Sequence, residues 1–167
     1  NEFTPMLRYR DSSSWLWPHE NIVDTFYEIT GLDSLTQSDD VVICINFTAI
    51  AEPIKKQAEQ LKKTLGASII EMTALPEYLG NGAIPNPESG KKFCARLQQL
   101  LHELKNKYGA QRAHLLVCAS NAACVFIGQA IDLHHPEIIA YDFAKDDMVA
   151  RLVIKNNGIT NMLELPY

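Results

Sequence analysis

The amino-acid sequence predicts an α/β domain built around a parallel sheet. The first observation is a set of short apolar runs rich in β-branched residues, which are typical of strands buried on both faces. The second is that amphipathic helical patterns lie between these runs, so that strand and helix alternate from about residue 40 onward. Three successive strand–helix–strand steps form a parallel sheet with helices on both faces. We therefore expect a Rossmann-like sheet flanked by helices.

The first expected strand, residues 41–47, is the run VVICINF. The helix after it has Pro53 in its first turn and Gly66 at its end, positions that suit these residue types. Its apolar side chains recur at helical spacing opposite a lysine face, at Ile54, Ala58, Leu61 and Leu65. A second strand is expected over residues 67–72.

A loop rich in Gly, Pro and Asn, PEYLGNGAIPNPESG, separates the second strand from a long helix. The pattern then predicts a strand over residues 114–118, a helix over 121–133 and a strand over 138–143, and the apolar run 150–154 adds an edge strand. The long helix has one apolar face, at Phe93, Leu97, Leu101, Leu104 and Tyr108.

Residues 1–39 do not fit this alternation. We expect them to form an irregular lead-in segment that packs on the sheet or completes a pocket, with a helix over residues 21–29 leading into the first strand. Residues 40–167 form the second predicted unit. The chain begins at Asn1 without a methionine, and we expect it to be part of a longer protein.

Composition and charge restrict the function. A net charge of −5 argues against wrapping duplex DNA, because that binding requires Lys and Arg to neutralise phosphates. A pocket for one or two phosphates needs only backbone amides and stays possible. The cysteines at 44, 94, 118 and 124 form no CxxC pair and indicate free thiols in a reducing compartment. The sequence shows no signal-peptide pattern and no apolar run of membrane-spanning length.

Ligands of doubly wound sheets bind beyond the carboxyl ends of the strands. Three such ends matter in this sequence: Thr48-Ala49-Ile50, Ser120-Asn121-Ala122-Ala123 and Asp142-Phe143. The second is the best candidate, because alanines let a ligand approach the backbone and a helix N-terminus favours an anion. The spacing leaves equally open that Ser120 or Asn121 only caps the helix.

Several enzymatic sites are disfavoured. Ser120 is not a GxSxG nucleophile, since its flanks are Cys118 and Ala122. The stretch GNGAIPNPESGKKF is not a P-loop, because Lys91 is followed by Lys92 where Ser or Thr is required. The dinucleotide fingerprint GxGxxG is missing after the first strand. We therefore expect no catalytic residues in this chain.

Metal binding is disfavoured as well. His134 and His135 are adjacent, so they point in different directions, and no partner has ligand spacing. We expect them to end a helix, where a cation meets the negative pole. The pairs Asp39-Asp40 and Asp146-Asp147 are expected to be solvated turn carboxylates. The sequence predicts neither a metal nor a cofactor.

Aromatic and arginine residues suggest further ligand contacts. Trp15 and Trp17 would share one face of a strand, as would Arg8 and Arg10. Aromatic faces stack on bases and arginines bind phosphates. The alternative, that the tryptophans fill the core, is at least as well supported. Tyr141 is either buried in the sheet or placed at the carboxyl end of its strand.

The run HLLVCASNAACVFIGQAIDLHHPEIIAYDF, followed by ARLVI, resembles the closing half of a SAVED domain. The family's pattern is an apolar strand, a turn of small residues, a helix with Ala and Gly, a Tyr-Asp/Glu-aromatic strand and a short final strand. The resemblance covers residues 40–155, and 114–143 is its distinctive part. The sequence departs from the family at Ser120-Asn121, where many relatives have proline, and its length accommodates little more than one of two CARF-like halves.

This resemblance implies a CARF-like sensor of bacterial CBASS antiphage systems, located in the cytoplasm. Such domains bind a cyclic oligonucleotide made by a partner nucleotidyltransferase and then self-associate to activate a fused effector. We expect the effector to be a fused nuclease, such as an HNH endonuclease, and DNA to be contacted only through that nuclease domain. We expect no membrane contact. A cyclic dinucleotide such as a cyclic GMP–AMP isomer is the favoured ligand, and a trinucleotide is the other class. Its phosphate would contact Ser120–Ala123 and Thr48-Ala49.

Two alternatives of other classes stay open. The chain is a ring nuclease that degrades such messengers, as some CARF relatives do, or it is a plain α/β oligomerisation scaffold that binds no nucleotide. Product formation would indicate the ring nuclease, and the absence of any ligand would indicate the scaffold.

Overall fold

A computed structural model describes residue 17 and residues 25–161 as one sheet flanked by helices. The predicted α/β class is confirmed. The elements in chain order are β1 (Tyr27–Thr30), the short 3₁₀ helix η1 (Leu32–Ser34), β2 (Asp40–Asn46), α1 (Glu52–Leu65), β3 (Ser68–Ala74), α2 (Pro87–Asn106), β4 (Arg112–Cys118), α3 (Asn121–Gln129), β5 (Glu137–Ala144), β6 (Asp147–Lys155) and β7 (Gly158–Asn161).

The sheet has seven strands in the order β1-β3-β2-β4-β5-β6-β7. The four central strands, β3, β2, β4 and β5, are parallel as the strand–helix alternation predicts. The outer strands β1, β6 and β7 pair antiparallel with their neighbours. The sheet is therefore mixed rather than wholly parallel.

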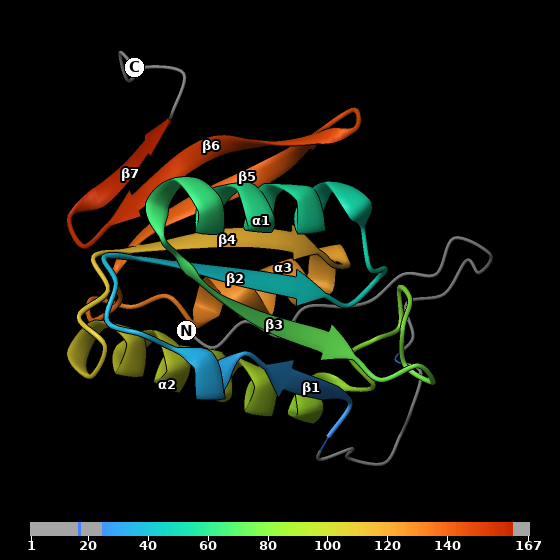
Figure 1. Ribbon diagram of the computed structural model, residues 1–167. Coiled ribbons are helices and arrows are strands. Elements are labelled where there is room, and N and C mark those ends of the chain that lie inside the picture. The colour runs from blue at the N-terminus through green and yellow to red at the C-terminus, as the bar shows by residue number, and fades with distance from the viewer. Residues whose placement is uncertain (1–16, 18–24, 162–167) are drawn as a thin grey trace.

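Helices cover both faces of the sheet (Figure 1). On one face, Ile54, Ala58 and Leu61 of α1 pack against Val42 and Cys44 of β2. On the other face, α2 and α3 enclose the larger core, with buried side chains that include Phe93, Leu97, Leu101, Leu104, Phe126 and Ile127. Alternate residues of β2 enter the two cores, which explains why this strand is apolar throughout its middle.

The lead-in segment differs from the prediction. Residues 27–29 are not helical, because β1 pairs with β3 from Tyr27–Ala74 to Thr30–Glu71. Their exposure alternates between half-buried and exposed, which is the period of a strand at a sheet edge. Part of residues 1–39 thus belongs to the sheet, while the division of the chain at residue 39 stays a prediction.

Several boundaries also differ. The helix predicted over 121–133 ends at Gln129, and the Asp132 carboxylate then accepts from the His134 N–H at 2.7 Å, forming a side-chain turn in place of another helical turn. The strand predicted over 150–154 extends over 147–155 and is not at the edge, since β7 pairs with it. Leu65, predicted on the apolar face of α1, is 45% exposed because it lies in the last turn, beyond the core.

Candidate functional site

The carboxyl ends of β2 and β4 form the point where the sheet reverses its winding. From β2 the chain passes through α1 to β3 on one side, whereas from β4 it passes through α3 to β5 on the other. Ligands of open α/β sheets bind in the crevice at such a switch point. The loops that follow these two strands contain Thr48 and Ser120, so the two predicted segments meet here.

Backbone hydrogen bonds hold the two strand ends together. The N–H groups of Phe47 and Thr48 both donate to the Cys118 carbonyl, each at 2.9 Å. Gly80, from the loop between β3 and α2, donates to the Phe47 carbonyl, also at 2.9 Å. Thr48 is half-buried and Ala49 is exposed. The structure therefore brings Thr48-Ala49 next to the turn that begins at Ser120.

Ser120 is the N-cap of α3. Its backbone is extended, and its Oγ accepts from the Ala123 N–H at 3.3 Å. Its carbonyl accepts from Cys124 N–H at 3.0 Å. The capping alternative is thus observed, but it does not use the first amides of α3: by helix geometry, the N–H groups of Asn121 and Ala122 have no partner inside the helix. Those amides and the positive pole of the helix can hold an anion.

The alanines of the turn contribute backbone rather than side chains. Ala122 and Ala123 are 4% and 1% exposed, and Ala123 belongs to the larger core. Their small side chains let the start of α3 lie close to the sheet. This packing fixes the position of the backbone amides of the first turn. Asn121 and Cys124 are the exposed residues of this first turn.

The tryptophan and arginine candidates of the N-terminal segment divide into two groups. Trp17 packs on the larger core, with its ring centroid 6.4 Å from that of Phe126 in α3. This is the core position that the sequence left as an alternative, and stacking of Trp17 on a base stays a prediction. Arg8, Arg10 and Trp15 lie outside the described residues.

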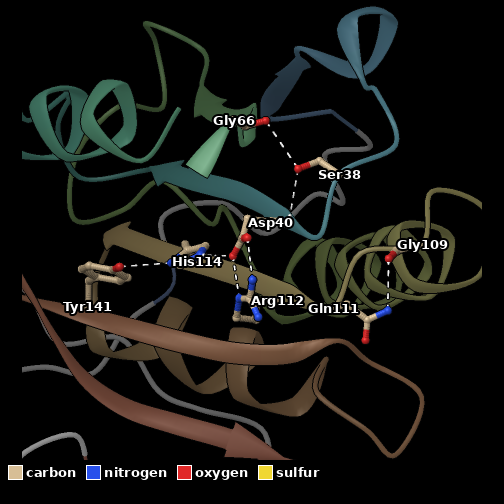
Figure 2. A network of polar contacts seen from close by, with 8 residues as sticks. All are labelled: Ser38, Asp40, Gly66, Gly109, Gln111, Arg112, His114 and Tyr141. Atoms are coloured by element: carbon tan, nitrogen blue, oxygen red, sulfur yellow. Dashed lines mark hydrogen bonds and ion pairs between the residues drawn. The ribbon is translucent and has the colours of Figure 1, made fainter. Parts of the chain in front are cut away.

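Tyr141 joins a polar network that extends to the amino ends of β2 and β4 (Figure 2). Its hydroxyl is 3.1 Å from His114 Nδ1, and His114 Nε2 is 2.8 Å from Asp40 Oδ1. Arg112 completes the network with two bonds to the Asp40 carboxylate, both at 2.7 Å. Asp40 and Arg112 are the first residues of β2 and β4. The Tyr141 hydroxyl is therefore directed toward the amino ends of these strands, away from the Ser120 turn.

This network corrects the interpretation of Asp40 as a solvated turn carboxylate, because Asp40 is 3% exposed. The Arg112 hydrogen bond holds the pKa of the Asp40 carboxyl below its ordinary value, while burial acts in the opposite sense. Burial and the nearby Asp40 charge raise the pKa of Tyr141 to about 12. Sequence reasoning missed this cluster, because residues 40, 112, 114 and 141 come together only through strand pairing.

The histidine pair lies beyond α3 instead of ending it, because the helix stops at Gln129. His135 is buried and its Nδ1 contacts the Pro136 carbonyl oxygen, whereas His134 is exposed and its ring lies against that of His102. Among the described residues, no group of His, Cys, Asp and Glu is arranged to hold a metal ion.

A surface hollow of about 620 Å³ lies elsewhere, between the end of α2 and the β6–β7 turn. Lys105, Gln111, His135 and Asn156 are among its lining residues. This hollow lies at the amino ends of β4 and β5, whereas ligands of open α/β sheets bind beyond the carboxyl ends of the strands. The edge at Thr48 and Ser120 is therefore the better candidate for an anionic ligand.

Comparisons with known proteins identify the family and the fold of this chain. The model of the SAVED family, the SMODS-associated and fused to various effectors sensor domain, matches residues 1–154. No curated protein matches the sequence. None of the helices in the described part of the chain is long and apolar enough to cross a bilayer.

Three solved structures share the fold. The Acinetobacter baumannii Cap4 SAVED/CARF-domain containing receptor with the cyclic trinucleotide 3'3'3'-cAAA is 17% identical, with a TM-score of 0.59 over 75% of this chain and 27% of the receptor. The same receptor with 2'3'3'-cAAA is 17% identical, with a TM-score of 0.59 over 75% of this chain and 26% of the receptor. The receptor described without a nucleotide is 16% identical, with a TM-score of 0.55 over 76% of this chain and 25% of the receptor. The chain thus spans about a quarter of the receptors it resembles.

Proposed function

Because the chain belongs to the SAVED family of sensor domains, we propose that it binds a cyclic oligonucleotide and reports that binding to an effector. The observation that carries the proposal is the N-terminus of α3 at the switch point, where Ser120 begins the helix beside the end of β2. A cyclic oligonucleotide offers several phosphates close together, and such an edge is suited to one of them.

We propose that the backbone amides of the first turn of α3 contact the phosphate. Thr48 and Ala49, in the loop after β2, contact it from the other side. The α3 dipole supplies a favourable field without a formal charge, which fits a protein of net charge −5. A sensor needs no nucleophile or general base, and the proposed contacts include none.

We propose a cyclic di- or trinucleotide as the ligand. Cyclic GMP–AMP isomers represent the first class, and the adenine trinucleotides of the Cap4 receptors represent the second. Two further parts of the proposal concern the whole protein: a partner nucleotidyltransferase makes the ligand in the cytoplasm, and binding drives self-association that activates a fused effector, such as an HNH endonuclease.

The proposal is tested by a thermal-shift and calorimetric titration of the chain with cyclic di- and trinucleotides, using the linear forms as controls. A ligand that binds only the folded state raises the midpoint in proportion to the logarithm of its concentration above the dissociation constant. We expect stabilisation by one cyclic species and little by its linear form. No stabilisation by any cyclic species would contradict the proposal. Chromatography of the incubated nucleotide separates a sensor, which returns it intact, from a ring nuclease, which linearises it.

A further inference from the structure

The end of β2 contains two buried polar atoms without a hydrogen-bond partner in the part of the chain described: Asn46 Oδ1 and Thr48 Oγ1. Asn46 is 2% exposed, and its Nδ2 donates to Thr73 Oγ1 of β3 at 3.3 Å. Turning the amide around would pair Thr73 with the oxygen and leave the nitrogen alone. One atom of this amide therefore lacks a partner in either orientation.

Such atoms need a physical reason. Buried polar groups in folded proteins are almost always paired, because an unpaired one loses its hydration without compensation. Between Val41 and Ile45 every side chain of β2 is apolar and fully buried. The strand becomes polar only at its carboxyl end, where Asn46 and Thr48 flank Phe47.

The location of these atoms connects them to the proposed site. Side-chain alternation places Asn46 on the face that holds Val42 and Cys44, under α1. Thr48 follows Phe47, and both donate their N–H groups to the carbonyl that ends β4. The two unpaired atoms thus lie at the same strand ends as the α3 amides.

We infer that Asn46 and Thr48 are the hydrogen-bonding contacts that recognise a nucleotide of the ligand, Asn46 at the edge of its base and Thr48 at a second polar atom. This inference rests on the proposed function. A side-chain amide both donates and accepts, which matches the amino group and ring nitrogens of a base and exceeds what phosphate oxygens alone can use. Since protein atoms cover both groups, binding includes a local rearrangement of residues 48–51, where Ala49 and Ile50 are exposed.

The Thr48→Val variant separates this role from a structural one. Valine keeps the shape and removes the unpaired hydroxyl, so we expect a melting temperature without nucleotide equal to or above that of the wild type. The same change removes a contact to the ligand, and we expect an affinity about 5- to 30-fold lower. A structural hydroxyl would produce the opposite result: lower stability and unchanged affinity.

Asn46 is tested through the base. The wild-type chain and Asn46→Ala are titrated with the best cyclic ligand and with an analogue in which one base lacks its amino group. We expect the wild type to discriminate between the two by about 5- to 30-fold at one base position, and the variant to discriminate much less. A general loss of packing would weaken both ligands equally.

The control is Thr64→Val, because the Thr64 hydroxyl donates to the Gln60 carbonyl at the far end of α1, at 2.8 Å. We expect its affinity to match the wild type. If the wild type binds a cyclic nucleotide but Thr48→Val and Asn46→Ala bind it within twofold of the wild-type affinity, the inference is wrong and the proposed function stands. If the wild type binds none, both are wrong.

Discussion

The backbone N–H of Thr48 donates to the carbonyl oxygen of Cys118 at 2.9 Å, across the two strands where the sheet reverses its winding. This bond ties the start of the loop after β2 to the last residue of β4, directly before the turn that leads into α3. A phosphate held by the α3 amides and a base held at the end of β2 would therefore contact a single connected edge.

Ser120 is both the cap of α3 and part of the proposed phosphate site, and two substitutions distinguish these roles. Aspartate and asparagine are both good N-caps, so Ser120→Asp and Ser120→Asn should fold with melting temperatures close to the wild type. Aspartate adds a negative charge where the phosphate binds, and we expect about a tenfold or greater loss of affinity. Ser120→Asn, the neutral control, should bind with near-wild-type affinity. Equal ligand affinity of the two variants would show that the phosphate does not bind at this turn.

The Asp40 network makes stability depend on acid pH. Arg112 lowers the pKa of Asp40 in the folded chain, so the unfolded chain takes up protons first as the pH falls. The stabilisation is complete above the ordinary aspartate pKa of about 4 and is lost as the pH falls through the lower folded value. Denaturation of the wild type and Asp40→Asn between pH 7 and pH 3 checks this.

The magnitude at neutral pH follows from the environment of the pair. We expect Asp40→Asn to lower the free energy of unfolding by about 2 kcal/mol, less than for a fully enclosed ion pair because the Arg112 side chain is 41% exposed. The difference between wild type and variant should shrink below pH 4. A difference that grows on acidification would show that the carboxylate is not stabilised by Arg112.

Tyr141 tests where the network ends. Removing its hydroxyl in Tyr141→Phe leaves a nitrogen of the buried His114 without its 3.1 Å partner, and we expect a loss of about 1 kcal/mol of stability. Nucleotide affinity should stay unchanged, because the hydroxyl faces away from the Ser120 turn. A large loss of affinity at unchanged stability would instead establish Tyr141 as a ligand contact.

Gly90 sets the distance between α2 and α3. A Cβ atom at this position would lie 2.3 Å from the Phe126 ring, so Gly90→Ala forces the ring or the helix to shift. We expect a cost of about 1–3 kcal/mol, measured by urea denaturation. In the Phe126→Leu background the same change should cost less, because the clashing ring is gone. Additive costs would show that the ring is not the obstacle.

The sequence was sufficient for the central sheet, because β2 and β4 are apolar runs and α1 and α2 have clear buried faces. It also located Thr48 and Ser120 at strand ends, since the strand–helix alternation fixes which ends share an edge. The outer strands were harder to predict. Residues 27–30 form a four-residue strand whose pairing with β3 is decided by tertiary contact and not by its own pattern.

The polar groups show the same limit. Nothing local distinguishes buried Asp40 from its neighbour Asp39, because its burial depends on Arg112 and His114, more than 70 positions away. Likewise, Asn46 is an ordinary strand-end residue in the sequence. Its unpaired amide atom becomes visible only when Thr73 and Cys118 are placed beside it.

Hydrogen–deuterium exchange of the chain with and without its cyclic nucleotide tests the site most directly. We predict slower exchange in two segments, residues 47–52 and 119–125, with little change around residues 105–112 and 155–158 at the other edge of the sheet. Protection confined to that other edge, or no protection at the Ser120 turn with nucleotide bound, would contradict the assignment of the site to the ends of β2 and β4.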